Sequence, residues 1–184
     1  MRDRLLAQDC LTTLIDLDPN GVWAEVTGAM IDFLPVEEDH GALIRAMSDA
    51  AIRIVSLTVT EGGYYTDAGS RLDPDHLDIR LDAAHPDRPA TAFGAMVAAL
   101  RVRRAAGQGP FTGQCCDKLQ NNGAMLRQTV VGLARPSDPE LADWIDRKIS
   151  ISQRDGRLPS ARDRPARAGP GLLARHRESH PGQA

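Results

Sequence analysis

The sequence predicts an α/β protein with a mostly parallel sheet flanked by helices, and three segments carry this prediction. Residues 51–59 form a continuous run of apolar and β-branched residues, which is typical of a strand buried on both faces of a parallel sheet. Residues 91–106 have helical periodicity, and residues 110–134 contain a further strand, a polar turn and a helix. The order strand, helix, strand, helix favours a parallel sheet with crossover helices.

The first fifty residues precede this pattern and predict smaller elements. Residues 1–8 favour a short helix. Residues 11–17 and 22–27 are β-prone and flank the turn signal Asp18-Pro19-Asn20-Gly21, so we expect a hairpin or two neighbouring strands. Residues 39–49 have apolar side chains at helical spacing and predict a helix that packs on the sheet.

A long polar stretch, residues 72–89, separates the first predicted strand from the next helix. Three X-Pro pairs interrupt it, so we expect an irregular excursion without a regular element. Its Asp and His residues lack a ligand spacing, which favours a solvated loop over a metal site. The helix at 91–106 is expected to be amphipathic, with Thr91 capping its start and Gly107 ending it.

Three arginines follow one another closely near the end of that helix. Arg101, Arg103 and Arg104 either meet a phosphate or form a charged face in water, and the charged face is the favoured interpretation. Residues 139–149 predict one more helix.

The composition excludes several classes of protein. The 184 residues are 42% hydrophobic and 26% charged, which is ordinary for one globular domain. A net charge of −3 gives no electrostatic case for nucleic acid or an anionic membrane, and no apolar run reaches the length of a membrane span. Three cysteines, with Cys115 and Cys116 adjacent, form neither a disulfide framework nor a zinc site. We therefore expect a cytoplasmic protein.

The first predicted strand ends abruptly in Glu61-Gly62-Gly63-Tyr64. In parallel sheets, ligands bind outside the carboxyl ends of the strands, where glycines allow close approach to the backbone. An exposed Gly-Gly turn without function explains the same residues equally well.

Several segments resemble one family, the long-chain mannitol dehydrogenases. These zinc-independent polyol dehydrogenases include the fructuronate reductases. The segment SLTVTEGGYY resembles the family's S-L-T-[IV]-T-E-G-G-Y, and PFTGQCCDKLQNNG resembles its P-F-T-[VI]-x-S-C-D-N-[LI]-x-x-N-G. The other matches, in the family's order, are QDCLTTL, FGAMVAALRVRR and PELADWI. Matches spread over residues 8–149 are far more specific than a single glycine-rich loop.

The resemblance implies a Rossmann-like dinucleotide-binding domain over residues 1–153. It implies reversible hydride transfer between a polyol and the corresponding ketose, with NAD as the cofactor, NADP not excluded, and no metal. The family's first strand, its glycine-rich phosphate loop and its helical domain with the catalytic lysine have no counterpart in this sequence. We therefore expect the isolated chain to have little or no activity, and a non-catalytic α/β remnant or interaction module is the alternative.

The resemblance also implies the site residues. Asn122 stands where the family has an active-site asparagine, which would polarise the reacting oxygen or contact the substrate; an N-cap of the following helix is the structural alternative. The residues expected to line the cofactor crevice are Glu61, Gly62, Gly63 and Asp117. Lys118 replaces a family asparagine, which puts the contacts to the nicotinamide in doubt.

The tail, residues 154–184, changes composition to Arg, Pro, Gly, Ala and His, and we expect it to be disordered. Residues 155–165 can be encoded so that a shifted reading frame gives M-V-D-C-L-P-P-A-T-G-P, similar to the family's M-V-D-x-x-x-P-A-T. A frameshift is therefore our hypothesis for the tail, and a basic segment that binds nucleic acid is the weaker alternative.

Overall fold

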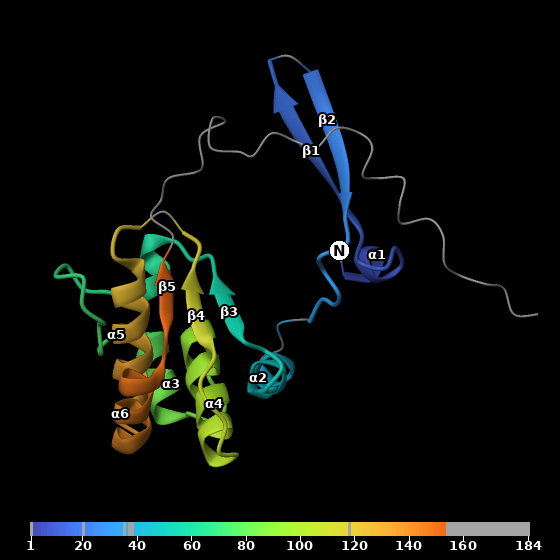
Figure 1. Ribbon diagram of the computed structural model, residues 1–184. Helices are drawn as coiled ribbons and strands as arrows, with labels where there is room; N and C mark the ends of the chain where they lie inside the picture. Colours follow the sequence, from blue (N-terminus) through green and yellow to red (C-terminus); the bar gives the residue numbers. More distant parts are fainter. Residues whose placement is uncertain (1, 20, 35, 37–38, 118, 154–184) are drawn as a thin grey trace, which may run out of the picture.

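β-Prone residues on both sides of the sequence Pro19-Asn20-Gly21 fold the N-terminal part into a hairpin. In the computed structural model, which describes residues 2–19, 21–34, 36, 39–117 and 119–153, a short helix α1 (Arg2–Leu6) precedes β1 (Thr12–Asp18) and β2 (Gly21–Thr27). The strands pair antiparallel, with Asp18 opposite Gly21 at the turn. The predicted hairpin is therefore confirmed, and it projects away from the rest of the protein (Figure 1).

Three short parallel strands form a separate sheet. β3 (Ile54–Leu57), β4 (Thr112–Cys115) and β5 (Ile151–Gln153) lie in the order β3-β4-β5. Both pairings are parallel, which confirms the predicted sheet type. β5 was not predicted, because three residues are too few to show a strand pattern.

Helices connect and cover these strands. Their bounds are α2 (Gly41–Ser48), the 3₁₀ helix η1 (Glu61–Tyr64), α3 (Leu77–Ala84), α4 (Ala92–Ala105), α5 (Asn122–Ala134) and α6 (Pro139–Lys148). α5 packs on β4 and β5, and α4 packs on α2 and α5. The elements predicted at residues 39–49, 91–106, 124–134 and 139–149 are all present as helices.

The described helices cover only one face of the parallel sheet. On the covered face Gly113 lies so close to α5 that an added Cβ would come within 2.9 Å of a Leu126 methyl group. On the other face Ile54 is 56% exposed, and Ser56 beside it is also exposed. The expectation that the first strand is buried on both faces is wrong for this chain, since no described element packs on the second face.

α4 is the centre of the hydrophobic core. The side chains from Phe93 to Leu100 are buried on every side of the helix, so the predicted amphipathic helix is instead a buried one. Its predicted ends are confirmed: Thr91 Oγ1 accepts a hydrogen bond from Gly94 N at 2.9 Å, and Gly107 continues the chain with φ +70°.

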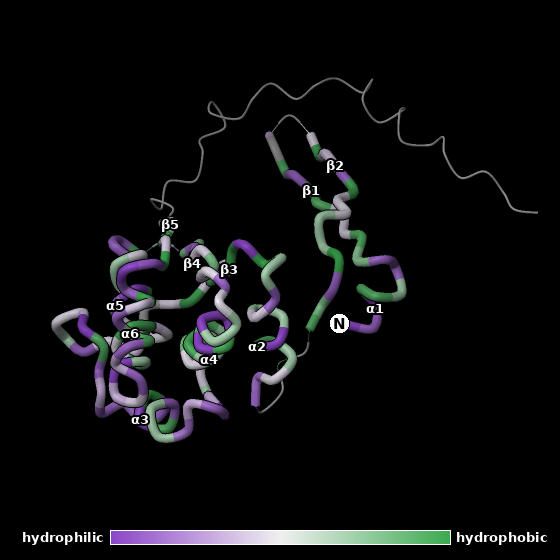
Figure 2. Tube along the Cα trace, turned by 60° about the horizontal axis from the view of Figure 1, so that its bottom comes forward, coloured by the Kyte–Doolittle hydropathy of each residue, from purple (hydrophilic) through white to green (hydrophobic). Residues whose placement is uncertain are grey.

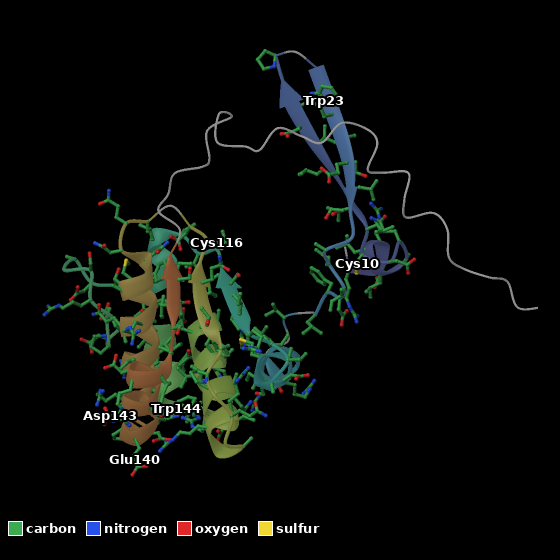
Figure 3. All side chains as sticks on the ribbon, in the orientation of Figure 1. Cys10, Trp23, Cys116, Glu140, Asp143 and Trp144 are labelled. Carbon is green, nitrogen blue, oxygen red and sulfur yellow. The ribbon has the colours of Figure 1, made fainter. Side chains whose placement is uncertain are left out.

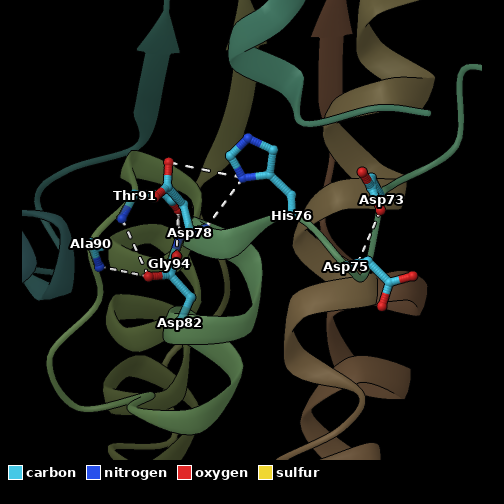
Figure 4. A network of polar contacts seen from close by, with 8 residues as sticks. All are labelled: Asp73, Asp75, His76, Asp78, Asp82, Ala90, Thr91 and Gly94. Carbon is cyan, nitrogen blue, oxygen red and sulfur yellow. Dashed lines mark hydrogen bonds and ion pairs between the residues drawn. The ribbon is translucent and has the colours of Figure 1, made fainter. Parts of the chain in front are cut away.

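The polar stretch at 72–89 contains a helix that the sequence did not predict. α3 buries only Ile79 and Asp82, so it lacks the apolar periodicity that signals a helix. Asp82 Oδ1 accepts from Ala90 N and Thr91 N, and its Oδ2 accepts from Thr91 Oγ1 (Figure 4). The buried carboxylate thus joins α3 to the start of α4.

Arg103 belongs to the core rather than to a charged surface. It is 3% exposed, and its guanidinium donates to the carbonyl oxygens of Gly109, Met47, Asp49 and Ile52 at 2.9–3.0 Å. The guanidinium also lies 5.6 Å from the centre of the Phe111 ring. Both sequence interpretations of this residue, a phosphate contact and a solvated charge, are therefore wrong. Arg103 instead ties the segment before β3 to the segment before β4.

The predictions for the tail, residues 154–184, concern residues outside the described part of the structure. Within the described residues, no helix combines the length and apolar character needed to cross a membrane.

Candidate functional site at the carboxyl edge of the parallel sheet

The exits of β3 and β4 meet at one edge of the sheet. The two strands are parallel neighbours, so the segments that follow them, η1 after β3 and the turn at Asp117 after β4, lie at the same end. Tyr64 Oη donates a hydrogen bond of 2.5 Å to Asp117 Oδ2. Two motifs separated by about fifty residues in the sequence therefore form one local structure.

Asp117 is the centre of this polar cluster. Its Oδ1 accepts hydrogen bonds from Asn122 Nδ2 at 2.7 Å and from Leu119 N at 3.0 Å. Burial by itself would raise the pKa of Asp117, but the hydrogen bonds from Tyr64, Asn122 and Leu119 outweigh burial and leave this pKa lowered. The carboxylate is thus held ionised at the sheet edge.

Asn122 is the first residue of α5 and is 1% exposed. The N-cap is Asn121, at φ 58°, and its side chain makes no capping hydrogen bond. The N-cap interpretation of Asn122 is therefore wrong, because its side chain bonds to Asp117 instead. A carboxylate only accepts, so Asp117 fixes the amide with Nδ2 inward. Asn122 Oδ1 has no hydrogen-bond partner among the described residues.

Tyr64 supports the cluster from the core. It is fully buried, and its ring packs on Phe93 with centroids 5.6 Å apart. Burial, and then the hydrogen bond to Asp117, raise the pKa of Tyr64 far above its ordinary value. Burial likewise raises the pKa of the neighbouring Cys115 thiol. The sequence analysis gave the Tyr64 hydroxyl no role, and the position of Tyr64 directly after the glycine pair was the available signal.

The glycine pair leaves the backbone accessible. Gly62 is exposed, and a Cβ added there would meet no atom within 4 Å. The Gly63 position is tighter, with Val59 Cβ 3.3 Å from an added Cβ. Glu61 begins η1, but its side chain lies outside the described part of the structure, so its predicted contact with the cofactor stays a prediction. Lys118 also lies outside the described residues.

Two further features lie at this edge of the sheet. A Cβ added at Gly62 would meet open space, and the N-terminus of the 13-residue α5 brings a partial positive charge to the same end of the sheet. Cys116, exposed at the end of β4, marks this end in Figure 3. Among the described residues, no group of three or more His, Cys, Asp or Glu side chains is arranged to hold a metal ion.

Comparison with known proteins places the chain in a family. The family described as "Mannitol dehydrogenase Rossmann domain" matches residues 1–154. The chain belongs to this family. The match confirms the resemblance seen in the motifs and the Rossmann-like fold expected from it.

The chain is similar to two curated relatives and to two solved structures. The chain is 61% identical over 151 residues to a mannitol 2-dehydrogenase of Cereibacter sphaeroides, covering 82% of this chain and 32% of the relative. It is 42% identical over 147 residues to a polyol:NADP oxidoreductase of Gluconobacter oxydans, covering 79% of this chain and 30% of the relative.

Among solved structures, D-sorbitol dehydrogenase in substrate-free form superposes with a TM-score of 0.76 at 38% identity. Pseudomonas fluorescens mannitol 2-dehydrogenase, in a ternary complex with NAD and D-mannitol, superposes with a TM-score of 0.75 at 42% identity. Each alignment covers 81% of this chain and 31% of the other. The chain thus spans about a third of the length of its curated relatives.

Proposed function

We propose that this chain serves as the cofactor domain of an NAD-dependent polyol oxidoreductase, which transfers a hydride reversibly between a polyol and the corresponding ketose. The observation that carries the proposal is the Tyr64–Asp117 hydrogen bond, which joins the exits of two parallel strands into one corner in a member of this family. NADP is not excluded, since one relative is a polyol:NADP oxidoreductase. No metal takes part in the proposal.

We call the residues that follow β3 and β4 at this edge of the sheet the corner, and the proposal gives each of them a role. Glu61, Gly62 and Gly63 line the cofactor crevice, with the open space beside Gly62 receiving the ligand. Asp117 holds the corner together. When bound, the nicotinamide supplies the hydride donor or acceptor.

Asn122 serves the substrate side of the site in this proposal. Asp117 orients its amide, and the buried Oδ1, which has no partner among the described residues, is the atom that would accept a hydrogen bond from a substrate hydroxyl. A polar group fixed in advance in this way costs little reorganisation when the ligand arrives. The acid/base group of the reaction is not assigned to any residue here.

We further propose a cytoplasmic role in carbohydrate metabolism, with a small polyol or ketose as the partner and neither nucleic acid nor membrane. The three free cysteines fit a reducing compartment.

Calorimetric titration of the chain with NAD and with NADP tests the proposal. We expect weak, saturable binding and little or no turnover with mannitol, fructose or fructuronate. Asp117→Asn should weaken binding, because it disturbs the hydrogen bonds of the corner. Asp143→Asn is the matched control. Asp143 pairs with Arg135 on the surface, at the opposite end of the β3-β4-β5 sheet and its helices (Figure 3).

Two results would contradict the proposal. A folded chain that binds neither dinucleotide would favour the non-catalytic interaction module. Turnover at a normal rate with any of the three substrates would refute the expected lack of activity.

A further inference from the structure

Two of the three asparagines in the chain precede a glycine, and one of these pairs lies in the corner. Asn20-Gly21 belongs to the turn signal of the hairpin, and Asn122-Gly123 begins α5. An asparagine before glycine is chemically labile, because glycine has no Cβ to shield its backbone nitrogen from the neighbouring side-chain amide. The buried asparagine of the corner is therefore part of a reactive dipeptide.

The reaction of such a pair is an intramolecular displacement. Gly123 N attacks the side-chain carbon Cγ of Asn122, so that a new N–Cγ bond closes a succinimide ring and the Cγ–Nδ2 bond breaks. The proton of Gly123 N leaves with the amide nitrogen as ammonia. Water then opens the ring at either carbonyl carbon, which gives aspartate or isoaspartate at position 122. Water is the one external reactant.

The Gly123 nitrogen lies at the start of the helix, ahead of its hydrogen bonds. The first backbone bonds of α5 run from Ala124 N and Met125 N to Asn121 O, at 2.9 and 3.1 Å. Gly123 precedes both donors, so its N–H is among the groups that a helix start leaves without an intrahelical acceptor. Gly123 also lines a hollow of about 580 Å³ where α5, α6 and β5 adjoin, three elements that Figure 2 shows side by side. Solvent in this hollow can supply the water that opens the ring.

Two features of the folded chain prevent the attack. Asn122 Nδ2 donates to Asp117 Oδ1 at 2.7 Å, which fixes the amide on the carboxylate. Ring closure also requires Gly123 N to swing toward Cγ, and the helical ψ of about −42° does not bring the two atoms into line. The side chain and the first turn of α5 must therefore both open before the ring can close.

The N-cap residue does little to hold this first turn closed. Asn121 makes no capping hydrogen bond with its side chain, and its φ of 58° is a left-handed conformation that is unfavourable for a residue with a Cβ. Helix ends fray readily. The bond from Asn122 to Asp117 is therefore the side-chain contact that anchors the turn, and Tyr64 Oη holds the same carboxylate from the core.

We propose that Asn122-Gly123 is a deamidation site that the hydrogen bond to Asp117 keeps closed and that opens when this bond is lost. The change is permanent, because neither product can restore the bond. Aspartate at position 122 would set a second acceptor-only carboxylate against Asp117, and isoaspartate would add a methylene group to the backbone of the first turn. The bond that shapes the corner thus also protects it chemically. Cofactor binding plays no part in this proposal, so it is tested independently of the proposed function.

Peptide mass spectrometry of the full chain, incubated at neutral pH, tests the proposal. Trypsin cleaves after Lys118 and Arg127, so Asn122 is followed in the peptide 119–127, separately from Asn20. In concentrated urea both pairs should react at similar rates, because the following glycine dominates the rate of an unfolded segment. In the folded chain, Asn122 should react at least about tenfold more slowly than in urea, since the reaction requires local opening.

Variants of the corner test the role of the hydrogen bond. Asp117→Ala should accelerate the reaction of Asn122 in the folded chain at least about tenfold, because a hydrogen bond to a charged group contributes about that factor or more. Asp143→Ala is the matched control, since it removes a surface carboxylate that pairs with Arg135, and it should leave the rate unchanged. Gly123→Ala, added to Asp117→Ala, should slow the reaction severalfold, because a Cβ shields the attacking nitrogen.

Two further variants separate local opening from a general loss of stability. If far-UV circular dichroism shows that Asp117→Ala is unfolded, Tyr64→Phe replaces it, because this change keeps the packing on Phe93 and removes only the donor to Asp117. Leu100→Ala weakens the core without removing a hydrogen bond of the corner, and it should leave the rate of the folded chain unchanged.

Three outcomes would overturn the proposal. The first is a folded wild-type chain in which Asn122 reacts as fast as in urea. The second is a folded corner variant that reacts no faster than wild type. The third is an equal acceleration in Leu100→Ala and in the corner variant, which would assign the protection to the fold as a whole and not to Asp117.

Discussion

The hairpin and the helix-backed sheet differ in how they are stabilised. From Met47 onward, buried side chains of α4, α5 and α6 form one continuous core. In the first 36 residues, Cys10 is the one buried hydrophobic residue among those described. Backbone pairing joins β1 and β2 in the hairpin, whereas packing of buried side chains supports the parallel sheet. The polar cluster Tyr64–Asp117–Asn122 depends on such a packed core, because buried neighbours fix its geometry.

The largest expected effect on the free energy of unfolding is at a leucine of the core, and a leucine of the hairpin serves as the comparison. Leu100 is fully buried in α4, so Leu100→Ala should lower the free energy of unfolding by about 2–5 kcal/mol. Leu17→Ala, at a position 79% exposed, should change it by no more than about 0.5 kcal/mol. Urea unfolding followed by circular dichroism measures both. Equal losses would show that the hairpin is packed in solution.

The buried guanidinium should come next. Arg103→Met leaves four carbonyl acceptors without their donor, and we expect a loss of about 3 kcal/mol in unfolding free energy. Arg101→Met is the matched control, since Arg101 lies nearer the surface and pairs with the exposed Asp87. A small effect of Arg103→Met would mean that its four hydrogen bonds do not hold the segments before β3 and β4 together.

The corner at the sheet edge should respond to loss of one hydroxyl. Tyr64→Phe keeps the packing on Phe93 but removes the donor to Asp117 Oδ2, so we expect a loss of about 1–3 kcal/mol in stability. We also expect weaker NAD binding by calorimetry. Tyr65→Phe serves as the control, because no hydrogen bond joins the Tyr65 hydroxyl to this corner. Unchanged NAD affinity in Tyr64→Phe would separate the corner from the cofactor site.

Acid should weaken the same corner. The pKa of Asp117 is lowered in the folded state, so the unfolded state binds more protons below the ordinary Asp pKa of about 3.9. The contribution of Asp117 is therefore complete above that pH and is lost as pH falls through the folded-state pKa. Denaturant midpoints measured from neutral to acid pH should fall less steeply in Asp117→Asn than in wild type. Identical pH profiles would contradict this.

The smallest effect on stability is expected at Gly62. An added methyl group meets no atom within 4 Å, so Gly62→Ala should change the unfolding free energy by no more than about 0.5 kcal/mol. NAD affinity should nevertheless fall, because the methyl occupies the space proposed for the cofactor. Gly113→Ala provides the contrast, since its Cβ would press on Leu126 and destabilise the core.

Most elements of the fold could be predicted from local pattern, and the failures have specific causes. The turn signal Asp18-Pro19-Asn20-Gly21 and the cap at Thr91 involve only residues close together in the sequence. The hairpin and the start of α4 were therefore predicted correctly. α3 was missed because its helix is stabilised by contacts of Asp82 with residues eight and nine positions away, which leave no periodic signal. β5 was missed because it exists only through pairing with β4.

The sequence by itself determined the family, the parallel sheet type and the two segments that form the corner, because glycines, prolines and motif residues act through their own backbone and side-chain chemistry. Only the tertiary structure decided that Arg103 is buried, that Asn122 bonds to Asp117 instead of capping α5, and that Tyr64 contributes a hydroxyl. Those outcomes depend on which distant groups surround a side chain after folding. Burial and partners of this kind are properties of the packed chain and not of any segment alone.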